Sequence, residues 1–262
     1  MSDGSSTIEG VVERMAALLA PLEAEDDPRR YFLATYRRTT LAVQKALRSE
    51  HFVDPDWVER WDVTFASLYL DAVEAWTHDR PLPAPWAVAF AAGAGDRLPP
   101  LRHVLVGMNA HINFDLPLAL LAVIDDDELA DPDVVARRNI DHERIDLILA
   151  SRVDAENEEL KRLEEPGDRT WLDRLLTPFN KAASRRFMKE ARRKVWRNTL
   201  ILSEARREGP DELASGVAEL EALARARVAD LGVPGQVLLR LARDGFGVEL
   251  IQGRPELDDL TG

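Results

Sequence analysis

Residues 101–124 read LRHVLVGMNAHINFDLPLALLAVI, and this stretch decides the fold class of the chain. Its apolar residues recur at steps of three and four, through Leu101, Val104, Met108 and Ile112, which is the spacing of one face of an α-helix. Apart from Arg102 and His103 near its start, polar residues interrupt the stretch only in its middle, where some of them continue the apolar stripe. The stretch therefore predicts a helix that carries polar groups on a buried face.

Helical spacing continues on both sides of this stretch. Apolar stripes of the same period run through residues 8–22, 31–47, 57–76 and 134–153. Asp54 and Pro55 have the form of an N-cap followed by a first-turn proline. We predict an all-α fold, a single-domain multi-helix bundle of about eight to ten helices.

The predicted domain spans residues 1–262, with flexible tails at residues 1–7 and 253–262. No convincing series of alternating strands occurs, although residues 246–252 could form one short extended piece. No repeat of fixed period is present. The chain is therefore expected to fold around one core.

Composition excludes several classes of protein. The 262 residues include 34 Lys and Arg, 47 Asp and Glu and no Cys, for a formal net charge of -13. Without Cys there is no disulfide scaffold, no thiolate metal site and no cysteine nucleophile. The net negative charge argues against general nucleic-acid binding, because most of the surface would repel phosphates.

No segment has the features of a signal peptide or a membrane span. The N-terminus lacks a basic region followed by an apolar core. The most apolar stretch, Leu116–Ile124, is far shorter than the ~20 residues that cross a bilayer. We therefore expect a cytoplasmic protein without a transmembrane segment.

Two pairs of residues have the spacing of metal ligands on one helix face. His111 and Asp115 are four residues apart, and His142 and Asp146 repeat this H-x-x-x-D pattern on the next predicted helix. Asp62 lies beside an aromatic stripe on an earlier helix. A buried carboxylate is costly unless it is paired, protonated or bound to metal. These five residues predict a metal site inside the bundle.

Other interpretations of the same residues remain open. Asp115 precedes Leu116 and Pro117 and could simply cap a helix that begins there. The turn around His142 could be exposed and charged. The polar residues of the central stretch could instead form a satisfied buried network that fixes helix register, in a non-catalytic binding or scaffold protein. This network would contain Asn109, His111, Asn113 and Asp115.

A basic stretch stands out in this acidic chain. Arg185, Arg186, Arg192 and Arg193 lie in a segment that has only one acid, and apolar residues form its other face. One interpretation is a solvated face that pairs with acidic helices of the same bundle. The other is a rim that attracts a small anionic substrate or ligand.

The quoted stretch resembles the core helix of bacterial zinc phospholipases C and single-strand-specific zinc nucleases. In that superfamily an H-x-x-x-D segment is followed by Pro-Leu and, further on, by a second such pair, as His111 with Asp115 and His142 with Asp146 are here. Asp62 or Asp71 would match the family's early carboxylate. The family's next His is absent after Leu118, and its N-terminal tryptophan ligand is absent too.

This resemblance implies metal-dependent hydrolysis of a phosphate ester, with zinc favoured over iron or manganese. The metal would lower the pKa of a bound water, and Asp62 or Asp115 would act as the general base. A di-iron oxidase is an alternative, but no E-x-x-H pair is present. The string NAHINFDLP also resembles an uncharacterised actinobacterial helical family, which implies no activity.

Overall fold

The computed structural model describes residues 7–49, 51–92, 98–145, 148, 171–233 and 237–251, without the side chains of 171–188, 237–239 and 242. Every regular element in these ranges is a helix, which confirms the predicted all-α bundle. Residues 1–6 and 252–262 lie outside the description, so the predicted tails are not tested, except that Thr7 is placed as the N-cap of the first helix.

The described helices occur in a fixed order along the chain. They are α1 (Ile8–Ala24), α2 (Arg29–Leu47), α3 (Pro55–Thr77), α4 (Ala84–Ala91), α5 (Pro100–Ala110), the π-helix η2 (His111–Asp115), α6 (Leu116–Val123), α7 (Asp126–Leu129), α9 (Trp171–Glu208), α10 (Pro210–Gly232) and α11 (Val237–Asp244). Residues 132–145 are also helical.

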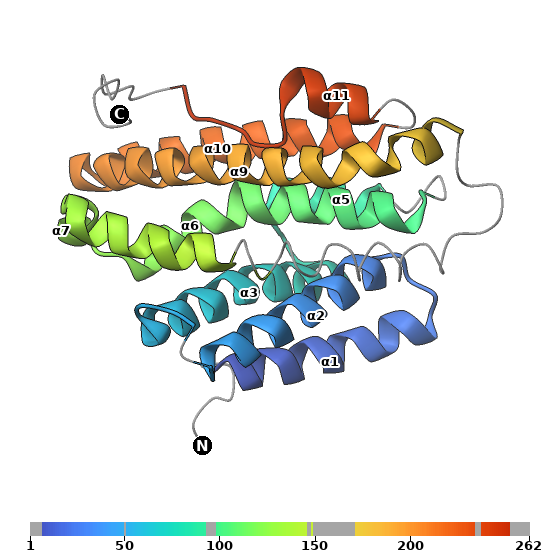
Figure 1. The fold of residues 1–262 in the computed structure, drawn as a ribbon, viewed down its shortest axis with the longest axis horizontal. Helices are drawn as coiled ribbons and strands as arrows, with labels where there is room; N and C mark the ends of the chain where they lie inside the picture. The colour runs from blue at the N-terminus through green and yellow to red at the C-terminus, as the bar shows by residue number, and fades with distance from the viewer. Residues whose placement is uncertain are drawn as a thin grey trace.

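The bundle has layers arranged around one continuous helix (Figure 1). This central helix consists of α5, η2 and α6 and spans Pro100–Val123. It contacts α2 and α3 on one side and α9 and α10 on the other. Val104, Ile112 and Leu120 are buried in the core that forms between these layers. The stretch that predicts the fold class is therefore the axis of the structure.

The central helix is long and apolar enough to cross a membrane by length and composition alone. Its most apolar window is 78% buried within the protein, as in the core helix of a bundle. No other helix in the described part of the chain passes the same test.

Sequence signals set several of the helix ends. Asp54 accepts a hydrogen bond from the backbone N–H of Trp57, so the predicted N-cap before Pro55 is confirmed. Thr7 caps α1 in the same way through the N–H of Gly10. These caps fix where α1 and α3 begin, and α3 carries Asp62 into the core.

Gly107 allows the central helix to lie close to α2. A Cβ atom at this position would lie 2.6 Å from the ring of Phe32, a side chain that is itself 6% exposed. The buried ring has no space into which to move, so a side chain here requires the two helices to separate.

We predict that Gly107→Ala destabilises the protein. Overpacking of this kind costs about 1–3 kcal/mol, which exceeds the gain in helix propensity. The free energy of unfolding from urea titration measures the effect. Gly232→Ala is the matched control, because its Cβ would make an ordinary contact at 3.8 Å with Ala92. Equal stability of the two variants would contradict the packing argument.

Candidate functional site

The candidate site begins at η2, in the middle of the central helix. Pro117 has no N–H group, so the carbonyl of Asn113 lacks the donor that a regular α-helix would supply. The backbone widens here, and the N–H of Leu116 donates to the carbonyl of His111, five residues back. Single π turns recur at functional sites. His111 and Asp115 lie at the two ends of this turn.

A hydrogen-bonded chain joins three buried side chains. His111 Nδ1 lies 2.8 Å from Asp115 Oδ2, and Trp86 Nε1 on α4 donates to the same oxygen at 2.9 Å. Burial lowers the pKa of His111, against the opposing effect of Asp115. Burial also raises the pKa of Asp115, which the hydrogen bonds partly oppose. In the neutral imidazole Nδ1 donates to the carboxylate, and Nε2 is left as a free acceptor.

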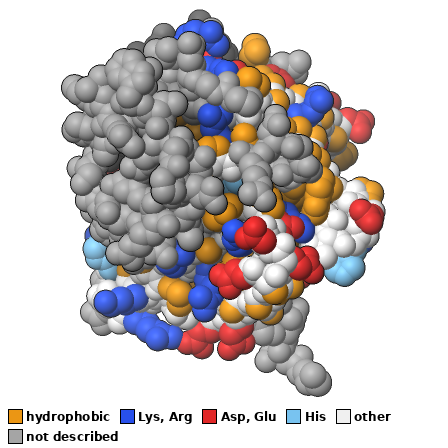
Figure 2. Space-filling model, turned by 90° about the vertical axis from the view of Figure 1, so that its right-hand side faces the viewer, with side chains coloured by type: hydrophobic (Ala, Val, Ile, Leu, Met, Phe, Trp, Pro, Cys, Tyr) orange, Lys and Arg blue, Asp and Glu red, His pale blue; other side chains and the backbone are white. Residues whose placement is uncertain are grey.

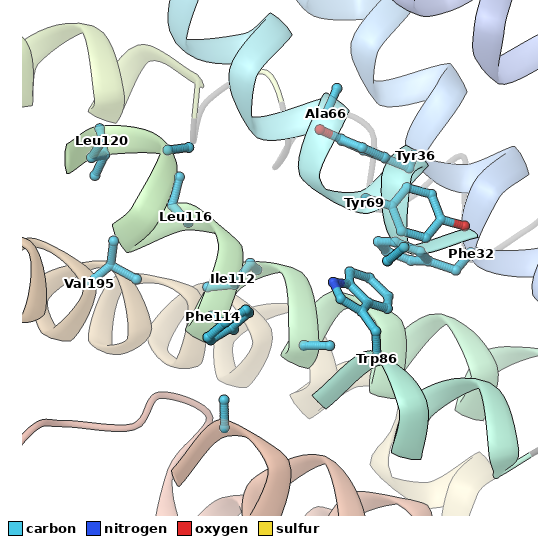
Figure 3. Close-up of a cluster of buried hydrophobic side chains, with 14 of the residues drawn as sticks. Phe32, Tyr36, Ala66, Tyr69, Trp86, Ile112, Phe114, Leu116, Leu120 and Val195 are labelled. Atoms are coloured by element: carbon cyan, nitrogen blue, oxygen red, sulfur yellow. The ribbon is translucent and has the colours of Figure 1, made fainter. Parts of the chain in front are cut away.

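Aromatic rings enclose His111. Phe65 stacks on the imidazole with ring centroids 3.6 Å apart, and Tyr36 meets it edge-on at 4.6 Å. Tyr69 and Trp86 both lie at 5.9 Å. Figure 3 shows Phe32, Tyr36, Tyr69 and Trp86 gathered beside the central helix. The imidazole therefore lies in an apolar, water-poor setting, where unpaired polar atoms are costly.

Four polar atoms in or near this shell are buried without a hydrogen-bond partner in the described structure: Tyr36 Oη, Asp62 Oδ2, Tyr69 Oη and His111 Nε2. Leaving a buried polar group unpaired costs about 1–3 kcal/mol. We use the name polar core for Tyr36, Asp62, His111 and Asp115. Its unpaired atoms are the feature of this protein that most needs a functional explanation.

Burial changes the acid–base properties of the polar core. It raises the pKa of Asp62 to about 7, with a further contribution from Glu59. It raises the pKa of Tyr36 well above the usual value, and the charges of Asp62 and Asp115 act in the same direction. Tyr36 is therefore a neutral phenol, and the charges of both carboxylates help to keep it neutral. The pKa of Asp62 lies near neutral pH.

His142 lies in a separate environment. Its ring stands between Trp61, at 5.1 Å, and Trp196, at 5.4 Å. Its Nδ1 accepts from Trp196 Nε1 and contacts Arg192 Nη1, both at 3.2 Å. Burial lowers the pKa of His142 well below the usual value, and the charge of Arg192 lowers it further. The guanidinium next to this ring disfavours a metal cation at the same place.

The structure does not gather the predicted metal ligands. Within the described residues, no group of three or more His, Asp or Glu side chains could hold a metal ion. A row of rings, Trp61 and Phe65, separates His142 from His111. Asp146 lies outside the described residues. The alternative early carboxylate, Asp71, is exposed and pairs with Arg14. Of the two predicted pairs, His111–Asp115 forms as the spacing predicts, and His142–Asp146 is not tested because Asp146 is not described.

The predicted anion-attracting arginines have different positions. Arg192 is 7% exposed and turned toward His142, whose carbonyl it also binds. Arg193 is exposed. Arg185 and Arg186 lie where the side chains are not described. On the face of the molecule in Figure 2, the described basic and acidic side chains are mixed.

The alternative of one buried network divides into two. His111 and Asp115 face the aromatic shell, whereas Asn109 and Asn113 bind the carbonyl of Phe246 near the C-terminus, at 2.9 and 3.0 Å. Residues two apart on a helix are about 200° apart around its axis, so the two pairs necessarily face opposite sides. Each face carries hydrogen bonds and one unpaired atom of the central helix, Asn109 Oδ1 on the first face and His111 Nε2 on the second.

A small surface pocket lies against the aromatic shell. Its walls include Phe32, Tyr69, Trp86, Phe90, His103 and Gly107. The hydroxyl of Tyr69 points away from that of Tyr36 (Figure 3). Burial raises the pKa of Tyr69, and the nearby charges of Arg29 and Asp27 have opposite effects on it. Tyr69 and Trp86 thus separate this pocket from His111.

The sequence alone does not indicate which residues surround His111. Phe65 and Tyr36 belong to apolar stripes, which predict core positions, and Trp86 could line a small-molecule pocket or fill the core. Their contacts with His111 join helices far apart in the chain, and no local spacing encodes such a contact. The position of Asp62 beside an aromatic stripe was the one local signal.

Comparison with known proteins identifies the family. The profile of DUF5995, a family of unknown function, matches residues 8–233. The chain belongs to the DUF5995 family. No curated protein matches it. No solved structure matches it either. The family thus includes the whole polar core but carries no assigned activity.

We predict that Asp62 makes stability fall with rising pH. Its pKa rises from 3.8 in the unfolded chain to about 7 in the folded one, so the folded state binds more protons between these values. The free energy of unfolding then falls by up to ~1.4 kcal/mol per pH unit from about pH 4 to 7, and levels off above. Urea titrations across this range measure the slope.

Asp62→Asn should remove this slope, because the amide does not titrate. Asp56→Asn, at an exposed position of the same helix, should keep the wild-type slope. Identical pH profiles for wild type and Asp62→Asn would show that Asp62 is not held in an environment that disfavours its charge.

Proposed function

We propose that this DUF5995 protein binds a small organic cation with N–H donors, namely a protonated amine, in the polar core. The observation that carries the proposal is the set of unpaired buried atoms at Tyr36, Asp62 and His111. In the neutral imidazole, His111 Nε2 is an acceptor. Asp62 Oδ2 is also an acceptor once the carboxyl ionises. A ligand that supplies donors and positive charge would satisfy both.

The charges of the polar core favour a cation over an anion. Asp62 and Asp115 are buried, and neither has a Lys or Arg partner among the residues that the structure describes. A cation near Asp62 would stabilise its carboxylate and lower its pKa. Binding would therefore release a proton near neutral pH and strengthen as the pH rises through 7.

The aromatic shell supports the same class of ligand. Phe65, Tyr36, Tyr69 and Trp86 surround His111 within 6 Å of its ring centre. Aromatic faces attract cations, most strongly where water is excluded, and cages of such rings recognise quaternary ammonium groups. The surface pocket against Tyr69 and Trp86 gives the ligand a route inward through a change in these two side chains.

The test compares two salts on the full chain. Methylammonium chloride should raise the melting temperature of the wild type above that in sodium chloride of equal ionic strength, and more so at pH 8 than at pH 6. Asp62→Asn should lose the difference, and Asp56→Asn should keep it. Equal melting temperatures in both salts, or stabilisation by sodium phosphate alone, would exclude an organic-cation site.

A metal-dependent phosphate-ester hydrolase is the second candidate. A metal-bound imidazole usually donates its other N–H to a carboxylate, as His111 does to Asp115. In this alternative His111 Nε2 would bind the metal and Asp62 would act as general base. The hydrolase activity itself is inferred from the resemblance to zinc phospholipases C. The bound metal would lower the pKa of a water molecule.

Metal content distinguishes this candidate from the first. If the hydrolase candidate is correct, protein purified without an affinity tag should contain one zinc, iron or manganese ion per chain by plasma mass spectrometry. His111→Ala should lose the ion, and His142→Ala should keep it because Arg192 faces that ring. A metal-free wild type that takes up no zinc on dialysis would exclude the hydrolase and leave the amine-binding proposal standing.

A further inference from the structure

The chain ends, as described, on an extended segment that lies along α9 and α10 (Figure 1). Gly245, with a φ of 74°, turns the chain out of α11. We call residues 246–251 the tail segment. Phe246, Val248 and Leu250 are buried, at 3%, 7% and 4% exposure, whereas Ile251 is 74% exposed. This alternation is that of a β-strand, although no strand pairs with it.

Two asparagine side chains hold the main chain of the tail segment. Asn113 donates to the carbonyl of Phe246 and accepts from the N–H of Val248, both at 3.0 Å. Asn198 on α9 repeats this arrangement two residues on, with the carbonyl of Val248 and the N–H of Leu250, both at 3.0 Å. Each side-chain amide thus joins residues i and i+2, as a peptide unit of a neighbouring parallel strand does.

Other side chains complete this arrangement. Asn109 donates to the carbonyl of Phe246, and Lys194 donates to that of Gly247. Glu190 accepts hydrogen bonds from the N–H groups of Phe246 and Gly247. Glu219 on α10 accepts a hydrogen bond from the N–H of Ile251. Within the described residues, no main-chain to main-chain hydrogen bond holds the tail segment.

We call the surface under this segment the tail groove. Its polar walls are Asn109, Asn113, Glu190, Lys194, Asn198 and Glu219. Because these side chains bind main-chain atoms, they would bind any extended peptide whose side chains fit. This is the logic of strand addition, in which main-chain bonds give affinity and alternate pockets give specificity.

The groove selects side chains at two further positions. A Cβ atom on Gly247 would lie 2.8 Å from the backbone Cα of Ala191, so only glycine fits there. Glu249 forms an ion pair with Arg197. Together with the buried positions, this defines a preferred sequence of apolar, glycine, apolar, acidic and apolar residues.

Two observations distinguish the tail groove from the tail segment that occupies it. The family match ends at residue 233, so every groove residue lies inside it and the tail segment lies beyond it. An open hollow also runs beside Gly247, Val248 and Glu249, with Arg227 and Asp244 among its walls. The tail segment therefore buries three apolar side chains in the core but has an open hollow along one side.

We propose that the tail groove binds an extended peptide of another protein, with the sequence pattern given above, and that the tail segment occupies the groove when this partner is absent. The tail segment then competes with this peptide for the tail groove. Release of the tail segment frees Asn113 and Asn198 for the incoming main chain. Neither the amine site nor the metal candidate is needed for this exchange.

The test uses a labelled peptide, DGFGVELIQ, which copies residues 244–252. The full-length variant Phe246→Ser/Val248→Ser weakens the tail segment as a competitor. It should bind the peptide saturably by fluorescence anisotropy, at least tenfold more tightly than the wild type does. Ile251→Ser, which alters an exposed position of the same segment, should bind like the wild type.

Two controls test whether binding uses the groove. A peptide with Gly247→Val should bind at least tenfold more weakly, because its side chain meets the Ala191 backbone. Adding Asn198→Leu to the serine variant should weaken binding of the original peptide to a similar extent. Equal binding of the two peptides, or no saturable binding by a serine variant whose circular dichroism is native, would overturn the proposal.

Hydrogen exchange on the unmodified wild type gives a test that needs no variant. The amides of Gly247, Val248 and Leu250 should exchange at least a hundredfold faster than that of Leu120 in the central helix, through local release of the segment. Exchange of all four amides at one rate, set by global unfolding, would show that the segment is a fixed part of the core and overturn the proposal. Exchange of the segment between copies as a dimer, without peptide binding, would also overturn it.

Discussion

The structure depends on one constraint, which is that a helix buried on both sides carries four buried polar residues in its middle, in addition to His103 near its start. Every buried polar group must find a partner or raise the free energy of the folded state. The central helix meets this demand by dividing its polar residues between two faces. Asn109 and Asn113 face the tail segment, which supplies carbonyl and N–H groups. His111 and Asp115 face α2, α3 and α4, where Trp86 supplies one donor and nothing described reaches His111 Nε2.

The π turn connects these two faces. Pro117 prevents a regular helix at Asn113, and the widened turn carries His111, Asn113 and Asp115 together. A shift of this turn moves groups on both sides of the helix at once. His111 and Asn113 therefore belong to the same turn, although they contact different layers of the bundle.

The sequence predicted what local spacing determines. Helical period and the cap at Asp54 predicted the all-α class and the start of α3, and the four-residue step predicted the His111–Asp115 pair. It did not predict contacts between distant helices. Trp86 and Phe65 entered the site from other helices, and Arg192 turned inward to His142 although its neighbours in sequence suggested a basic surface. Side-chain amides that bind a distant main chain leave no periodic signal at all.

The energetics of the tail groove decide how it can exchange its occupant. An empty groove would leave the buried amides of Asn109, Asn113 and Asn198 without their partners, and each unpaired group costs about 1–3 kcal/mol. Direct replacement of the tail segment by another peptide is therefore more favourable than release that leaves the groove empty. A tethered occupant acts at an effective concentration of about millimolar, so a free peptide competes only when it is abundant or fits better. The asparagines bind only the main chain, so they do not distinguish one peptide from another. A competing peptide could fit better at Arg197 and at the close approach of Gly247, because these two places select side chains.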